Sequence, residues 1–195
     1  MRKVPAFTLA SLVLAGAIGA SPREALAIER QHHFGLDPTL ALLKVDDKSS
    51  MSTAVGLGAH YTYGLNDQFN FMAELNASFM LEGEKLEAAT PMTPATPHTR
   101  PTQIGHALVG VGYVIDILRW VPYFGILAGG YRLAGGTLDN QLVVLGGAVQ
   151  VGLDYQLSRQ WAVGGAVQQH FLVTKMSDYP SYTTLMLRFE YMWGY

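Results

Sequence analysis

The sequence predicts an all-β protein: eight antiparallel strands that form an up-and-down transmembrane β-barrel. Three observations lead to this fold class. Apolar and polar residues alternate with a period of two in one segment after another, which is the pattern of a strand. Hydrophobic residues make up 49% of the chain and charged residues only 14%, yet no apolar run in the body of the chain reaches the ~20 residues of a spanning helix. The connections also alternate between tight and long, as they do in membrane barrels.

The first 27 residues are expected to be a secretory signal peptide. Arg2 and Lys3 give it a positive start, residues 4–20 are largely apolar, and Ala25-Leu26-Ala27 has the small-x-small pattern of a cleavage site. A retained membrane anchor is the less favoured alternative, because the apolar segment is short. We therefore expect residues 28–195 to be the exported barrel domain.

The first three strands are predicted at 33–44, 51–63 and 69–82. The first carries Phe34 and Leu36 on one face, but Pro38 interrupts it. Because proline has no N–H to donate to a neighbouring strand, we expect a bulge or a local break there. The second and third strands alternate regularly, and Glu74 falls on the polar face of the third.

The other five strands are predicted at 103–115, 121–133, 142–155, 161–173 and 184–195. The pattern is less clear in the first two of these. In the segment 121–133, Tyr123, Leu127 and Tyr131 share one face, and Arg132 lies on the other. Large apolar side chains mark the lipid-facing side in the clearer strands. Applied here, the same rule predicts that Tyr123 and Tyr131 face lipid and Arg132 faces the lumen.

The connections sort by length. Tight turns are predicted at 64–67, 116–119 and 156–160, and more variable polar loops at 45–50, 83–101, 135–140 and 175–182. With both termini at one end of the barrel, the tight turns lie at that end and the loops at the other. Short periplasmic turns, longer outer loops and an even number of strands are typical of transmembrane barrels.

The face with large side chains is expected to meet lipid. A soluble eight-stranded barrel packs its apolar residues inward, but the large set in this chain is too bulky for so small an interior. The aromatic residues near the strand ends also resemble an interfacial girdle; they are Tyr61, Tyr63, Phe69, Tyr113, Trp120, Tyr123, Tyr155, Trp161, Tyr191, Trp193 and Tyr195.

The last strand ends in alternating apolar and aromatic residues: Leu187, Phe189, Tyr191, Trp193 and Tyr195. With the strand count and the turn pattern, this ending resembles the small OmpA/OmpX-type outer-membrane barrels of Gram-negative bacteria. The resemblance implies a monomer in outer-membrane lipid. It also implies that these five residues are the C-terminal assembly signal, bound by the barrel-assembly machinery.

The inferred lumen contains Asp37, Glu74, Arg132, Arg188 and Glu190, and Asp154 also falls on an inward face. An isolated charge in a narrow, poorly solvated interior is costly, so these groups must pair or be hydrogen-bonded. From the inferred depths, we expect an ion-pair cluster of Arg188 with Asp37, Glu74 or both. Its expected role is to fill the lumen, as side chains do in small barrels. The alternative is a gated polar path or a proton-sensitive site.

Little in the sequence indicates chemistry. There are no cysteines, and the four histidines of the inferred lumen lack the close spacing of a zinc site, so we expect no metal and no cofactor. The formal net charge of −2 and the lack of a basic cluster argue against a nucleic-acid partner.

The expected function is therefore non-enzymatic, with a structural or surface-interaction role. Two alternatives remain open: a narrow channel for small or hydrophobic solutes, and an outer-membrane enzyme that modifies lipids. The proline-rich loop 83–101 is the candidate contact for a surface partner, because its composition favours an extended segment.

Overall fold

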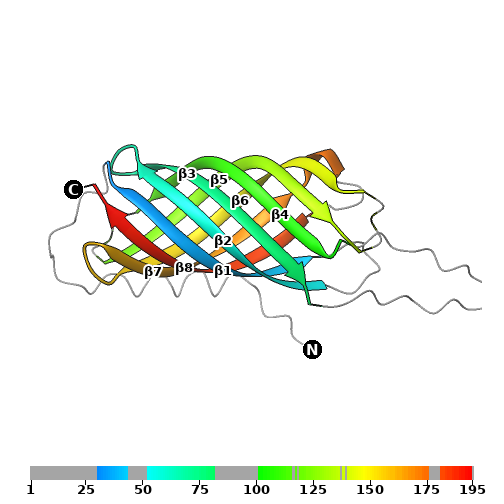
Figure 1. Ribbon diagram of the computed structural model, residues 1–195. Helices are drawn as coiled ribbons and strands as arrows, with labels where there is room; N and C mark the ends of the chain where they lie inside the picture. Colours follow the sequence, from blue (N-terminus) through cyan, green and yellow to red (C-terminus); the bar gives the residue numbers. More distant parts are fainter. Residues whose placement is uncertain are drawn as a thin grey trace, which may run out of the picture.

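The computed structural model describes residues 30–43, 52–81, 101–115, 117, 119–136, 138, 140–175 and 181–194. Eight antiparallel strands form one closed barrel, in which each strand pairs with its neighbours in the chain and the first pairs with the last (Figure 1). The predicted fold class is confirmed. The strands are β1 (His32–Leu43), β2 (Ser52–Gly64), β3 (Phe69–Met80), β4 (Gln103–Val114), β5 (Trp120–Ala134), β6 (Leu142–Gln156), β7 (Trp161–Phe171) and β8 (Ser181–Trp193).

One short 3-10 helix, η2 (Val173–Lys175), follows β7. No helix within the described residues is long and apolar enough to cross a membrane. The predicted signal peptide, most of loop 83–101 and Tyr195 lie outside the described residues.

Two of the tight turns, at 64–67 and 156–160, are held by short polar side chains. The Asn66 side-chain oxygen accepts hydrogen bonds from the backbone N–H groups of Gln68 and Phe69, at 2.9 and 2.8 Å. Ser158 Oγ does the same for Gln160 and Trp161, at 3.2 and 3.1 Å. Asn and Ser favour turns because their side chains can form such local bonds. Since His32 pairs with Trp193, β1 begins and β8 ends at this same end of the barrel.

Pro38 breaks one ladder and leaves the other intact. β1 pairs with β2 without interruption, Pro38 lying opposite Leu57. On the β8 side, Leu36 pairs with Phe189 and Thr39 with Met186, and this ladder forms no pair at the two positions between. The register is the same before and after the gap, so no residue is inserted. The expected local break is present, and there is no bulge.

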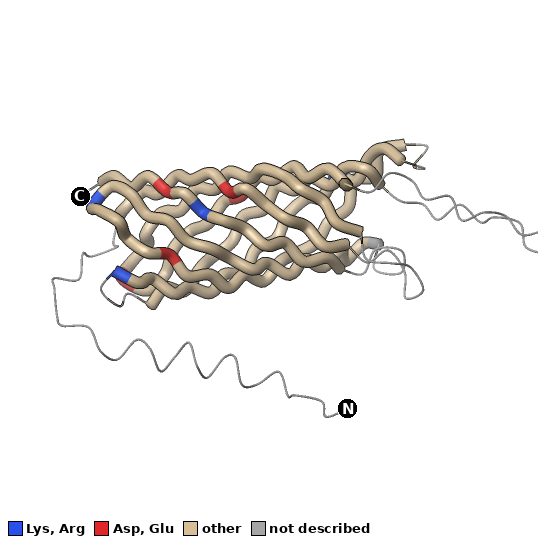
Figure 2. The backbone as a smooth tube through the Cα atoms, turned by 90° about the horizontal axis from the view of Figure 1, so that it is seen from below, with Lys and Arg blue, Asp and Glu red and all other residues tan. Residues whose placement is uncertain are grey.

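The two faces of the wall divide as predicted in seven strands. Large apolar residues point outward, with Leu75, Leu145 and Leu187 between 59% and 64% exposed. Most inward residues are small or polar, with a few larger apolar ones such as Leu108 and Met186 among them. Figure 2 shows how few charged residues the barrel wall carries, as expected of a surface that meets hydrocarbon.

β5 has the opposite orientation to the one predicted. Tyr123, Leu127 and Tyr131 point into the lumen and are 7%, 2% and 1% exposed, whereas Phe124 and Ile126 point outward at 42% and 55%. Both faces of this strand carry large residues, so size alone did not reveal its orientation. These inward side chains fill space left by the nearby strands β4, β6 and β7, which carry many inward glycines, among them Gly110, Gly112, Gly146, Gly152 and Gly164.

The same reversal corrects two residue assignments. Arg132 lies between the inward Tyr131 and Leu133, so its side chain is exposed on the outer face near the loop end of β5 and is not in the lumen. Tyr123 is buried and does not belong to the aromatic girdle.

The other girdle residues that are described lie on the outer face near the turns. Their rings pack in pairs across neighbouring strands: Trp120 with Tyr155 at 4.6 Å between centroids, and Trp161 with Tyr191 at 5.1 Å. Amphipathic aromatic side chains are enriched at the level of lipid headgroups. These pairs therefore mark the turn-side boundary of the membrane-spanning band.

Candidate functional site in the barrel lumen

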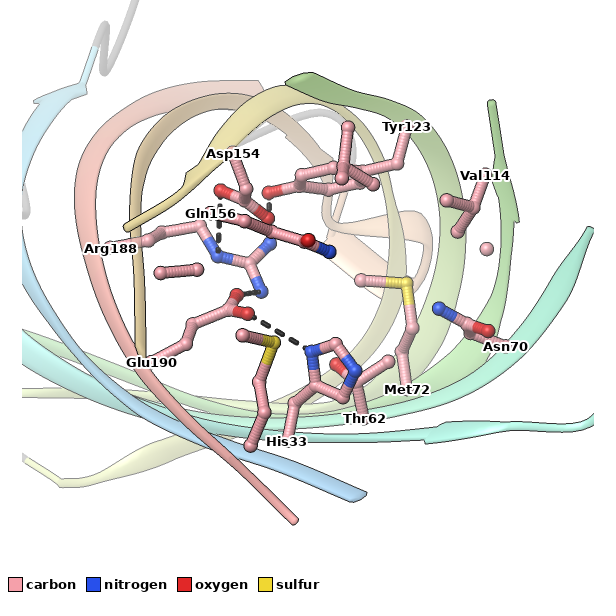
Figure 3. A pocket seen from close by; sticks show the side chains of 14 residues that line it. His33, Thr62, Asn70, Met72, Val114, Tyr123, Asp154, Gln156, Arg188 and Glu190 are labelled. Carbon is pink, nitrogen blue, oxygen red and sulfur yellow. Dashed lines mark hydrogen bonds and ion pairs between the residues drawn. The ribbon is translucent and has the colours of Figure 1, made fainter. Parts of the chain in front are cut away.

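Arg188 is the centre of a buried ionic network near the turn-side end of the lumen (Figure 3). It projects inward from β8, and its Nη2 donates to Glu190 Oε1 at 2.5 Å. Its Nη1 donates to the Tyr123 hydroxyl, and its Nε lies 3.9 Å from Asp154 Oδ1. The guanidinium also sits 4.7 Å from the centre of the Tyr123 ring. A buried cation is tolerated only with such partners.

His60 connects the arginine cluster to Asp37. Its Nδ1 lies 2.7 Å from Asp37 Oδ2 and its Nε2 lies 2.9 Å from Glu190 Oε1. Ionised carboxylates only accept hydrogen bonds, and a neutral imidazole has one N–H to donate. Both bonds can therefore form at once only if Asp37, His60 and Glu190 together hold one proton more than a neutral imidazole between two ionised carboxylates. His33 contacts the same glutamate, with Nδ1 3.1 Å from Oε2.

Glu74 belongs to a separate network around His106. His106 Nε2 lies 3.0 Å from Glu74 Oε1, and Gln168 Nε2 donates to Glu74 Oε2 at 3.2 Å. The other nitrogen of His106 lies 3.0 Å from the Tyr182 hydroxyl, and the Tyr182 ring stacks on His170 with centroids 4.0 Å apart. A single neutral tautomer of His106 satisfies its two bonds, because the tyrosine hydroxyl can act as donor.

The predicted cluster is therefore brought together only in part. Arg188 and Glu190 are in contact, but the ion pairs of the described residues join Asp37 and Glu74 to histidines and not to Arg188. The expected pairing of Arg188 with Asp37 or Glu74 is thus corrected. Arg132, on the outer face, takes no part.

Two partners of Arg188 were missed by the sequence reasoning. Tyr123 was assigned to the lipid face, and Asp154 was placed in the lumen but not in the cluster. A count of the buried charges would have pointed to the histidines. Within the described residues, the lumen holds four buried carboxylates but one buried arginine, Arg188; the carboxylates are those of Asp37, Glu74, Asp154 and Glu190. Histidine is the other side chain that can supply a positive charge there.

Glycines make room for this network. A Cβ on Gly152 would lie 2.2–2.5 Å from three side-chain atoms of Tyr123, and one on Gly164 would lie 1.9 Å from Asp154 Oδ1. A Cβ on Gly35 would meet His60 Cε1 at 2.2 Å. Glycine in a strand often marks such a close approach. These three positions fit the lumen side chains into a narrow barrel.

Replacing Gly152 by alanine should therefore lower the free energy of unfolding by about 1–3 kcal/mol, the usual cost of overpacking. The new methyl group would push the Tyr123 ring away from Arg188. Gly130→Ala is the matched control, because a Cβ there meets nothing within 4 Å. Urea unfolding of both variants in lipid vesicles measures the difference; equal stability of the two would contradict the packing account.

Within the described part of the chain, no three His, Asp or Glu side chains are grouped so that they could hold a metal ion. The histidines of the lumen instead contact carboxylates, tyrosines and a threonine.

The family model for the outer membrane protein beta-barrel domain matches residues 10–192. The chain belongs to this family. Similar solved structures include Neisserial surface protein A (TM-score 0.57, 13% identity, 84% of this chain and 97% of the other). Ail, the attachment invasion locus protein of Yersinia pestis, has a TM-score of 0.54 and 13% identity over 85% of this chain and 99% of its own. OprG of Pseudomonas aeruginosa has a TM-score of 0.52 and 12% identity over 86% and 98%. No curated protein matches the chain in sequence.

Membership of the outer membrane barrel family places the protein in the outer membrane of a Gram-negative bacterium, with its outward face in lipid. The four residues of the predicted assembly signal that the structure describes face this lipid. They are Leu187, Phe189, Tyr191 and Trp193, which are 59%, 50%, 38% and 38% exposed. At this level of sequence identity, the solved structures support the fold alone.

Proposed function

We propose that this protein is a non-enzymatic, monomeric barrel whose lumen is closed by side chains and which has a structural or surface-interaction role. The burial of the lumen is the observation that carries the proposal. Tyr131, Leu127 and Leu108 fill the barrel beyond the ionic network and are at most 2% exposed. Close-packed protein interiors leave few voids larger than a water molecule. The inward side chains thus form a plug and not a pore.

Single-channel recording in planar bilayers tests the closed lumen. We expect no persistent openings from the purified, folded protein. Stable ohmic openings would contradict the proposal and would favour the narrow channel for small or hydrophobic solutes. Migration of unboiled protein on a detergent gel confirms beforehand that the sample is folded.

A lipid-modifying enzyme is the rival hypothesis. Acyl transfer or hydrolysis requires a nucleophile activated by an adjacent base. Three of the lumen histidines contact carboxylates: His33 and His60 contact Glu190, and His106 contacts Glu74. His170 lies 2.9 Å from the Thr184 hydroxyl, but both residues face the lumen and are at most 1% exposed, out of contact with lipid. We expect no turnover when folded protein is incubated with phospholipid or lipid A, and release of fatty acid would favour the enzyme.

Loop 83–101 is proposed as the contact for a surface partner, because the long loops of such barrels face outward. Deleting residues 84–100 should leave the heat-dependent gel shift intact and abolish adhesion of barrel-coated beads to cells. Unchanged adhesion would exclude the loop as the contact for a surface partner.

The terminal strand, Tyr195 included, is proposed to engage the assembly machinery during insertion.

A further inference from the structure

Two of the three tight turns lie side by side on the rim of the barrel, and each carries an exposed arginine. Arg119 ends the turn before β5, and Arg159 lies in the turn between β6 and β7. A backbone hydrogen bond joins the two turns, in which Gln156 N–H donates to Arg119 O at 2.8 Å. Asp116, the one acidic residue in the sequence of these two turns, lies outside the described residues.

Neither of these guanidinium groups has an ion-pair partner in the described part of the chain. The ion pairs found there involve Arg188 and three histidines. The turn at 64–67 is different, because it carries Asp67 and contacts a base, Arg30, whose backbone N–H donates to Gly64 O at 2.9 Å. The rim therefore has a basic side, over β4–β7, where two cations are open to a partner.

The outer surface next to these two arginines is apolar and aromatic. Trp120 directly follows Arg119, Trp161 lies two residues after Arg159, and their side chains are 52% and 54% exposed. Leu157, in the second turn, is 58% exposed. Tryptophans of this kind sit at the level of lipid headgroups. An arginine there can rest its aliphatic stem on apolar surface while its guanidinium reaches the headgroups.

The chemistry of the two side chains indicates what they bind. A guanidinium matches the geometry of a phosphate, with which it forms paired hydrogen bonds. Short turns of outer-membrane barrels face the periplasm, and the periplasmic leaflet of the outer membrane is made of phospholipid. Basic residues at a membrane surface attract anionic lipids. The ammonium of a zwitterionic headgroup would offset this attraction, so a headgroup with a net negative charge fits better.

We propose that Arg119 and Arg159, with Trp120 and Trp161 beside them, form a binding site for the headgroup of an anionic phospholipid of the periplasmic leaflet, such as phosphatidylglycerol. The guanidinium groups contact the phosphate, and the indole rings contact the glycerol region and the first part of the acyl chains. The site lies on the outer surface, so it does not depend on whether the lumen is closed.

The tryptophans of the chain report on this side of the barrel. The three are Trp120, Trp161 and Trp193, all of them exposed on the outer face near the turns. Phospholipids with brominated acyl chains quench tryptophan fluorescence on contact, so quenching measures which lipid occupies the surface beside the rings. The folded protein is placed in phosphatidylcholine vesicles with a small mole fraction of one brominated lipid: phosphatidylglycerol, phosphatidylethanolamine or phosphatidylcholine.

We expect brominated phosphatidylglycerol to quench several-fold more strongly per mole than either zwitterionic lipid. Replacing both turn arginines by glutamine, Arg119→Gln with Arg159→Gln, should abolish this preference. Arg132→Gln, which removes an exposed arginine from the loop end of the barrel, is the matched control and should leave the preference unchanged.

Equal quenching by the three lipids would overturn the proposal. A preference for phosphatidylglycerol that survives the double replacement would also overturn it, because the lipid would then be held elsewhere. If the double variant does not fold, Arg119→Gln and Arg159→Gln are measured singly. Each should lose part of the preference, and an undiminished preference in both would contradict the site.

Discussion

Replacing Arg188 by methionine is expected to lower the free energy of unfolding by about 3–5 kcal/mol, the usual effect of removing one partner from a buried ion pair. Methionine fills much of the same volume, so the loss comes mainly from charge. Glu190 and Asp154 would remain buried without their cation, and the Tyr123 hydroxyl would lose its donor. Urea titration of the barrel in lipid vesicles, followed by tryptophan fluorescence, measures the change.

Arg132→Met is the matched control. The same substitution at this position removes an exposed arginine from the outer face, where an exposed charge contributes about 0–1 kcal/mol. A loss at Arg188 no larger than the loss at Arg132 would mean that the buried network does not stabilise the barrel.

Placing an arginine on the lipid face at mid-strand should also be strongly destabilising. Leu75 lies at the middle of β3 and is 62% exposed. At the bilayer midplane an arginine on this face costs about 2–4 kcal/mol, so we expect Leu75→Arg to reduce the free energy of unfolding by that amount. The same urea titration measures it.

The control for this prediction is another exposed apolar residue near the end of a strand. Val143 is the second residue of β6, on the loop side, and is 71% exposed. Near the interface the cost of an arginine falls to about 0–1 kcal/mol. Equal losses for Leu75→Arg and Val143→Arg would argue that the outward face does not span hydrocarbon.

The sequence predicted the architecture well because the physical signal was repeated. In β3 and β6, large outward residues alternate with small or polar inward ones, and each strand reports its own orientation. The tight turns were also readable, since Asn66 and Ser158 are residues that form local side-chain bonds. Strands of this kind, together with the alternating loop lengths, are compatible with one architecture.

The site was less predictable, because it depends on contacts between distant strands. In β5 both faces carry large residues, so the alternation does not indicate which face points inward. The inward face is decided by the space that the inward glycines of β4, β6 and β7 leave in the lumen. Because the orientation of β5 is the reverse of the predicted one, Tyr123 faces the lumen and Arg132 faces outward. Likewise, the pairing of Asp37 with His60 depends on the register of β1 against β2, which composition does not reveal.

The central claim is that β5 turns Tyr123, Leu127 and Tyr131 inward and so helps to close the lumen. Single cysteines introduced at Ile126, Leu127 and Ala128 of this cysteine-free chain can each carry a nitroxide spin label. The barrel in lipid vesicles should show high oxygen accessibility at positions 126 and 128, which face hydrocarbon, and low accessibility at position 127. High accessibility at 127 with low values at its two neighbours would contradict the inward orientation of β5 and the closed lumen that depends on it.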